Sequence, residues 1–84
     1  MDWDKYGFVN ASKYRKNIVI SLRDKPKTPK EIKEETDYYL SHVSNTLKEL
    51  SEEEVVKCLT ENRKKGRIYA LTDRGEEIAE QINK

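Results

Sequence analysis

The side chains best suited to recognise another molecule lie in the stretch 38–50. Five polar residues there can donate or accept hydrogen bonds, and only one of the five carries a fixed charge: Ser41, His42, Ser44, Asn45 and Lys48. An ordinary solvated helix face in this chain would be rich in Glu and Lys, because 39% of all residues are charged. We therefore interpret this stretch, over about 39–51, as a recognition helix that enters the major groove of double-stranded DNA.

The same stretch has the spacing of a helix with one buried side. Its apolar residues recur at intervals of three and four positions: Leu40, Val43, Leu47 and Leu50. Such a stripe would hold the helix against a core and leave the polar face turned outward.

Two helices are predicted before the recognition helix. Residues 12–24 carry apolar side chains four positions apart: Tyr14, Ile18 and Leu22. A second helix is predicted over 29–35, because the Thr-Pro-Lys-Glu sequence at 28–31 offers a capping hydroxyl, a proline at the first helical position and a carboxylate for a capping box. The short turn 36–38 then predicts a helix-turn-helix.

A β-hairpin and a last helix are predicted after it. The stretches 55–60 and 67–71 are rich in β-formers and flank a turn at 61–66. The turn and its exit concentrate positive charge, which is usual for a soluble edge but next to a helix-turn-helix also suits a phosphate clamp: Arg63, Lys64, Lys65 and Arg67. Thr72 is expected to cap the last helix.

The expected core joins these elements. It comprises ten residues: Ile18, Leu22, Ile32, Leu40, Val43, Leu47, Leu50, Tyr69, Leu71 and Ile78. Residues 1–11 show no clear period, and they either fold back over this core or form a dimer contact. One recognition helix reads only a few base pairs, so we expect a homodimer, formed through the segment around Trp3 and Phe8 and the last helix around Ile82.

The order of the elements, and three motifs within them, resemble winged helix-turn-helix regulators of the ArsR and MarR types from bacteria and archaea. Residues 41–50 have the pattern S-x-V-S-x-x-L-x-x-L of their recognition helix, and residues 66–75 have the pattern G-R-x-Y-x-L-T-x-x-G of their wing strand and its exit. Residues 28–32 are similar to the start of their second helix. The resemblance covers 12–82 and implies an α+β fold of three helices, a β-hairpin wing and a C-terminal helix. It also implies a sequence-specific DNA-binding transcriptional regulator.

Two places depart from the family pattern. Glu54-Val55-Val56 stands where members often have Gly-Leu-Val after the recognition helix. The turn before that helix has Asp37 and Tyr39 where members often have Gly and a capping Ser. Asp tolerates the left-handed conformation that Gly supplies, whereas Tyr39 has no side chain able to cap.

Under this interpretation the polar residues divide into two roles. Asn45 can pair with adenine and Lys48 with guanine, beside Ser41, His42 and Ser44. The DNA backbone would be held by basic and tyrosine side chains around the helix: Lys27, Lys30, Tyr39, Arg63, Lys64, Lys65 and Arg67.

Charge is segregated along the chain, although the formal net charge is only +1. Residues 1–30 carry eight Lys or Arg and three Asp or Glu, residues 31–61 carry three and nine, and residues 62–71 carry four and none. Local fields matter more than the total for phosphate binding. The low total and the acidic middle also leave a second interpretation open, in which the winged helix is a protein-contact module of a larger assembly.

The composition disfavours other classes of protein. Eighty-four residues predict one domain, 1–84, with 1–11 as an N-terminal extension. One His and one Cys, without metal-ligand spacing or a Gly-rich phosphate loop, predict no enzyme, metal or cofactor. We expect a cytoplasmic location, because no apolar run is long enough to span a membrane, no signal peptide is evident, and a single cysteine suggests a reducing compartment. Cys58 is expected to be a small apolar strand residue, with a redox role as the alternative.

Overall fold

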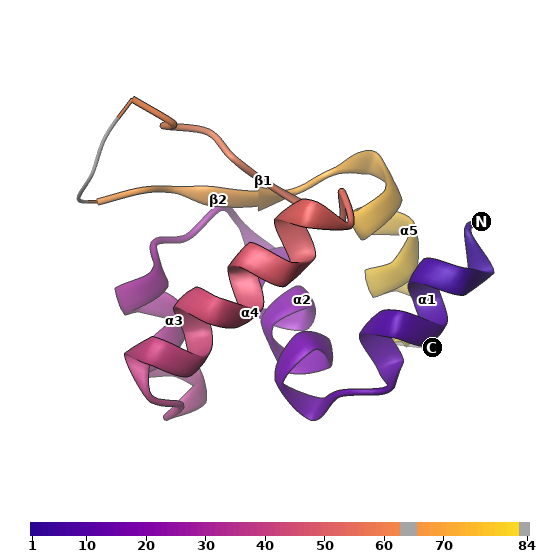
Figure 1. Cartoon of the computed structure of the whole chain (residues 1–84), viewed down its shortest axis with the longest axis horizontal. Helices are drawn as coiled ribbons and strands as arrows, with labels where there is room; N and C mark the ends of the chain where they lie inside the picture. Colours follow the sequence, from indigo (N-terminus) through magenta and orange to yellow (C-terminus); the bar gives the residue numbers. More distant parts are fainter. Residues whose placement is uncertain (63–65, 83–84) are drawn as a thin grey trace.

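Five helices and a two-stranded antiparallel sheet make up the computed structural model, which describes residues 1–62 and 66–82. In chain order the elements are α1 (Trp3–Asn10), α2 (Lys13–Asp24), α3 (Pro29–Thr36), α4 (Leu40–Glu52), β1 (Val56–Cys58), β2 (Tyr69–Leu71) and α5 (Asp73–Ile82). Figure 1 shows the hairpin running from the side of α5 across to the side of α3, with α4 beneath it. This is the winged helix-turn-helix arrangement that the sequence predicted.

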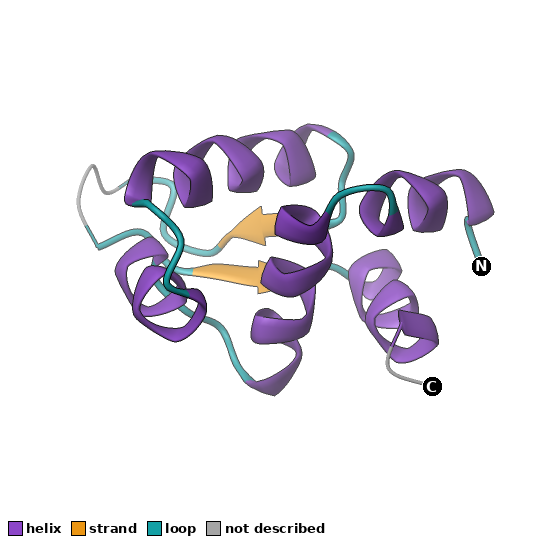
Figure 2. Cartoon of the chain, turned by 90° about the horizontal axis from the view of Figure 1, so that it is seen from below, coloured by secondary structure: helices purple, strands orange, loops and turns teal. Residues whose placement is uncertain are grey.

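The N-terminal segment forms a helix that the sequence analysis did not predict. The side chain of Asp2 accepts a hydrogen bond from the Lys5 amide and so caps α1. The helix packs against α2 and α5, and Val9 is completely buried, whereas Trp3 is 63% exposed. Figures 1 and 2 both place α1 and α5 together at one end of the molecule. Packing against these neighbours, rather than a periodic stripe, stabilises this helix.

The predicted helices are present with ends within one residue of those expected, but the two strands are shorter. Pairing is regular from Val56 opposite Leu71 to Cys58 opposite Tyr69. Beyond it, the Ile68 amide donates to the hydroxyl of Thr60 at 2.9 Å instead of to a backbone carbonyl. This side-chain acceptor ends the regular ladder before the predicted strand ends.

The loop between α2 and α3 joins the hairpin as a third, single-residue strand. The Lys27 amide donates to the Tyr69 carbonyl at 3.0 Å, and the Tyr69 amide donates to the Lys27 carbonyl at 2.8 Å. These two backbone bonds attach the wing directly to the helix-turn-helix.

The contacts of the segment that follows β2 explain the Thr and the second Gly in the pattern G-R-x-Y-x-L-T-x-x-G of residues 66–75. Thr72 caps α5, as predicted, because its hydroxyl accepts a hydrogen bond from the Gly75 amide at 3.1 Å. The same hydroxyl donates to the carbonyl of Glu54 at 2.7 Å. A Cβ atom at Gly75 would lie 2.1 Å from the Val55 carbonyl oxygen, so α5 can approach the start of the hairpin only with glycine here.

Most of the predicted core residues are buried. Eight of the ten are at most 7% exposed: Ile18, Leu22, Ile32, Val43, Leu47, Leu50, Leu71 and Ile78. Tyr69 is half-buried and packs against this cluster. The prediction for Leu40 was wrong, because its side chain is 46% exposed. Leu40 is the first residue of α4 and lies outside the core cluster, where it lines a surface hollow with Pro29 and Tyr69.

The C-terminus of α4 is closed by a glutamate in a left-handed conformation. Glu54 has φ 60°, its amide donates to the Ser51 carbonyl at 3.1 Å, and the Val55 amide donates to the Leu50 carbonyl at 2.9 Å. These bonds form a Schellman motif, in which glycine usually occupies the left-handed position. Glu54-Val55-Val56 therefore forms the helix cap that Gly-Leu-Val would form, but with a strained glutamate at the left-handed position.

Replacing Leu47 by Ala should lower the free energy of unfolding by about 2–5 kcal/mol, because the side chain is 1% exposed and its removal leaves a cavity. Leu40→Ala is the matched control and should cost less than about 1 kcal/mol. Urea denaturation measures both changes. A loss below about 1 kcal/mol for Leu47→Ala would contradict the helix register.

Glu54→Gly should raise the free energy of unfolding by about 1 kcal/mol. A non-glycine residue in the left-handed region costs roughly 1–2 kcal/mol, which exceeds the added entropy of an unfolded glycine, about 0.4–1 kcal/mol. Glu52→Gly, two residues earlier in the right-handed last turn, is the control and should destabilise by about 0.5–1 kcal/mol. Thermal unfolding at one pH distinguishes them, and equal destabilisation by both would contradict the strain at position 54.

Candidate nucleic-acid interface

The start of α3 is fixed by the capping box that the sequence predicted. The Thr28 hydroxyl accepts a hydrogen bond from the Glu31 amide at 3.2 Å, and the Glu31 carboxylate accepts one from the Thr28 amide at 2.9 Å. The hydrogen bond from the Thr28 amide, with a further contribution from the Thr28 hydroxyl, lowers the pKa of the Glu31 carboxyl. Pro29 occupies the first turn, as expected.

The turn into α4 depends on one left-handed residue. Asp37 has φ 61°, and its amide donates to the Lys33 carbonyl at 2.8 Å. The chain then reverses within three residues, and Tyr39 stands at the N-cap of α4 without a side-chain capping bond. Both features agree with the sequence analysis, in which Asp37 replaces glycine and Tyr39 cannot cap.

The polar face of α4 is accessible and rigidly presented. All five residues predicted to face base edges or nearby phosphates are exposed: Ser41, His42, Ser44, Asn45 and Lys48. The opposite face is anchored by buried side chains: Val43, Thr46, Leu47 and Leu50. Since the anchor fixes the rotation of the helix, the polar face has one defined direction.

Three of the seven predicted backbone contacts lie on the surface around α4. Tyr39 is 76% exposed, Lys30 is exposed on α3, and Arg67 is exposed in the hairpin just before β2. Arg63, Lys64 and Lys65 lie outside the described residues.

Lys27 is the predicted phosphate contact that the structure contradicts. Only 5% of the residue is exposed, and its ammonium group donates to the Ser21 carbonyl at 2.8 Å and to the Glu35 carboxylate. The hydrogen bond from Lys27 lowers the pKa of the Glu35 carboxyl, and the Ser21 hydroxyl adds to this effect. Breaking this arrangement would leave a buried charge without a partner, so Lys27 holds the loop in place and does not reach the surface.

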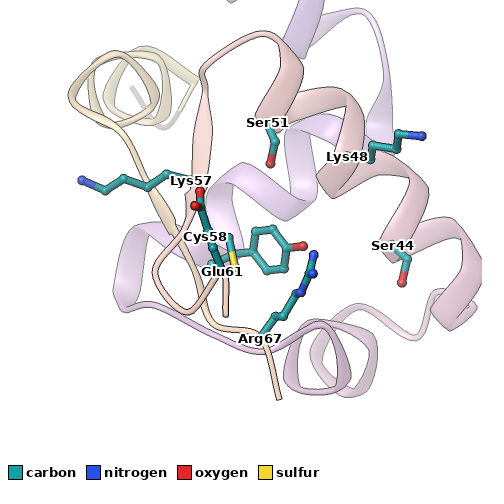
Figure 3. A pocket seen from close by; sticks show the side chains of 8 residues that line it. Ser44, Lys48, Ser51, Lys57, Cys58, Glu61 and Arg67 are labelled. Carbon is teal, nitrogen blue, oxygen red and sulfur yellow. The ribbon is translucent and has the colours of Figure 1, made fainter. Parts of the chain in front are cut away.

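A hollow of about 630 Å³ lies between α4 and the hairpin. Figure 3 shows the Arg67 guanidinium pointing into it, whereas the side chains of Lys48 and Lys57 extend away on opposite sides. Glu61 and Cys58 line the hairpin side. The groups are therefore spread over a surface and do not converge on one small ligand.

Lys57 is a basic surface residue beside α4 that the sequence analysis missed. It is exposed in β1 between the buried Val56 and the half-buried Cys58. The alternation of strand faces was a signal that could have identified it. Cys58 lies in β1, which agrees with its expected place in a strand. Its sulfur is 4.0 Å from the Thr60 hydroxyl oxygen.

Two acidic residues near the end of α4 form ion pairs with the N-terminal elements. The Glu49 carboxylate lies 3.3 Å from the Arg15 guanidinium of α2, and Glu53 pairs with Lys5 of α1. The Arg15 guanidinium also lies 3.9 Å from the centroid of the Phe8 ring. These carboxylates thus serve to hold α4 against the N-terminal helices.

Two kinds of feature are absent from the part of the chain that the structure describes. Residues 1–62 and 66–82 contain no group of three or more His, Cys, Asp or Glu that could hold a metal ion. Within the same ranges, no helix has the length and apolar character needed to cross a membrane.

The helix order, the tight α3–α4 turn and the attached hairpin define a winged helix-turn-helix protein. The chain belongs to the HxlR-like helix-turn-helix family, whose model matches residues 9–84. The broad class predicted from the motifs is thereby confirmed, and the match identifies the family as HxlR-like. No curated protein matches the chain.

Solved structures of ZitR from Lactococcus lactis share this fold. The wild-type protein in complex with DNA has a TM-score of 0.76 and 22% identity, covering 83% of this chain and 49% of that one. A mutant in apo form has a TM-score of 0.76 and 23% identity, covering 86% of this chain and 55% of that one. The chain therefore spans about half the length of these structures.

Proposed function

We propose that this chain binds double-stranded DNA as a transcriptional regulator, with α4 in the major groove. The observation that carries the proposal is the contrast between the two faces of α4. One face is anchored by fully buried Val43 and Leu50, and the other presents short polar side chains with a single lysine. A rigid helix with hydrogen-bonding groups along its exposed face is the form in which proteins read base edges.

The proposed roles follow from chemistry and position. Asn45 pairs with adenine and Lys48 donates to guanine, with Ser41, His42 and Ser44 beside them. Phosphates are contacted by basic and tyrosine side chains from outside α4: Lys30, Tyr39, Arg63, Lys64, Lys65 and Arg67. Lys57 joins this set because it is exposed on the hairpin beside α4.

Two comparisons support the proposal. The family is a helix-turn-helix family, and the DNA complex of ZitR has the same fold. We further propose that the chain resembles ArsR- and MarR-type regulators in its mode of action, since it carries their recognition-helix and wing patterns. A regulator of this kind acts in the cytoplasm, where its DNA is.

We also propose that the active form is a homodimer through α1 and α5. The two helices lie together at one end of the molecule, and Trp3 on α1 is 63% exposed. An exposed aromatic side chain as large as tryptophan is typical of a protein–protein interface. Sedimentation equilibrium should show a dimer that Trp3→Ser weakens, and a monomer at high concentration both free and on DNA would contradict the pairing.

The helix and the wing should respond differently to substitution. Asn45→Ala should cost about 1–3 kcal/mol of binding free energy on the preferred duplex, less on random DNA, and leave the salt dependence unchanged. Replacing Lys64 and Lys65 with Ala should weaken all duplexes alike and lower the slope of log affinity against log salt by about 0.9 for each lost phosphate contact.

Fluorescence anisotropy across salt concentrations measures both effects, with a duplex selected from random DNA as the preferred site. Glu34→Ala, on the exposed side of α3, is the control and should leave both the preference and the slope unchanged. If neither α4 nor the wing affects binding while the variants stay folded, these surfaces are not the interface, and the protein-contact interpretation takes precedence.

A further inference from the structure

Four aromatic rings gather where α2, the α3–α4 turn and α4 meet. Tyr14 of α2 lies edge-to-face with Tyr38, with ring centroids 4.7 Å apart and planes at 68°. Tyr14 makes a second such contact with His42, at 5.2 Å and 65°. Tyr39 contacts His42 from one turn earlier, at 5.8 Å and 82°. These distances and angles fall within the favoured range for aromatic pairs.

The rings beneath His42 are themselves fixed. Tyr14 is half-buried, and the Lys13 ammonium lies 5.7 Å from its ring centroid. The hydroxyl of Tyr38 accepts a hydrogen bond from the Asn17 side-chain amide at 2.7 Å. The Tyr38 amide in turn donates to the Thr36 hydroxyl at 3.3 Å. His42 thus rests on a support that extends from α2 through the turn.

The rings that support His42 also limit the rotamers of its exposed side chain. A histidine on an open helix face samples several rotamers, and ordering such a side chain on binding costs affinity. The rings of Tyr14 and Tyr39 restrict the imidazole of His42 from two sides before any ligand arrives. An imidazole offers one donor and one acceptor, or two donors, so its orientation decides which group it can recognise.

We propose that Tyr14 is a positioning residue for base recognition, which orients the His42 imidazole and so contributes to sequence preference without touching DNA. The inference rests on the proposed DNA-binding function. It assigns a role in specificity to α2, which lies behind the recognition helix. Figure 1 shows α2 beside α4, and the two helices pack together.

The first test concerns the free protein and needs no DNA. His42 is the single histidine of the chain, so its ring protons give one unambiguous set of NMR signals. Tyr14→Leu removes the ring current and should shift these signals, whereas Tyr14→Phe keeps a ring and should leave them close to the wild-type positions. Unchanged signals in Tyr14→Leu would overturn the contact on which the inference stands.

The second test measures sequence preference as the ratio of affinities for the selected duplex and a scrambled duplex. Tyr14→Leu should lower this ratio by about tenfold, the effect of losing one well-placed base contact, and Tyr14→Phe should preserve it. In a His42→Ala background, Tyr14→Leu should have no further effect on the ratio, because the side chain that it positions is absent.

The outcomes separate the two proposals. A chain that binds no duplex overturns the proposed function and this inference with it. If the chain binds DNA and Tyr14→Leu has the same sequence preference as the wild type, the inference alone is overturned. It is also overturned if Tyr14→Leu lowers the preference as much in the His42→Ala background as in the wild type. Thermal unfolding checks that each variant is folded. If Tyr14→Leu is not, Tyr14→Met replaces it, because a flexible thioether fills an irregular gap without a ring.

Discussion

Burial of one face of α4 is the constraint on which the proposed interface depends. Val43, Leu47 and Leu50 are at most 1% exposed, and α2 and α3 both pack against the helix. A helix turns by about 100° per residue, so a shift of one position in this packing would bury part of the polar face. The core of the protein therefore determines which side chains face outward, and a recognition surface follows from ordinary hydrophobic packing.

The position of the wing depends on a second, polar constraint. Lys27 exchanges two backbone hydrogen bonds with Tyr69, and its ammonium group is buried against Ser21 and Glu35. At the other end of the hairpin, the hydroxyl of Thr72 donates to the Glu54 carbonyl. Both ends of the hairpin are thus attached, one to the α2–α3 loop and one to the end of α4. Movement of the wing relative to α4 would break hydrogen bonds in partly buried surroundings, which costs free energy.

The sequence predicted the elements whose signals are local. The capping box at Thr28, the left-handed Asp37 and the apolar stripe through Leu47 each depend on spacing or on the chemistry of one residue, and all three are present. The features that the sequence analysis missed depend on tertiary packing. The helix α1 has no stripe, and Leu40 continues the stripe outside the core cluster. In the sequence, Lys27 does not differ from the other basic residues. Its burial depends on neighbours that only the fold brings to it.

The candidate site shows the same division. Exposure of Asn45 and Lys48 followed from the helical period. The contact between Tyr14 and His42 joins residues on different helices, and no spacing in the sequence indicates it. Roles that depend on two helices meeting can be found only once the crossing of those helices is known.

Titration of the isotope-labelled chain with the duplex selected from random DNA tests the central claim most directly, with backbone amide NMR shifts as the measurement. The account predicts that the largest shifts occur along the exposed face of α4, at Ser41, Ser44, Asn45 and Lys48, with smaller ones at Lys30 and Arg67. The amides of α5 should change little. Shifts that concentrate on α1 around Trp3 or on the acidic end of α4, with none at Asn45, would contradict the account.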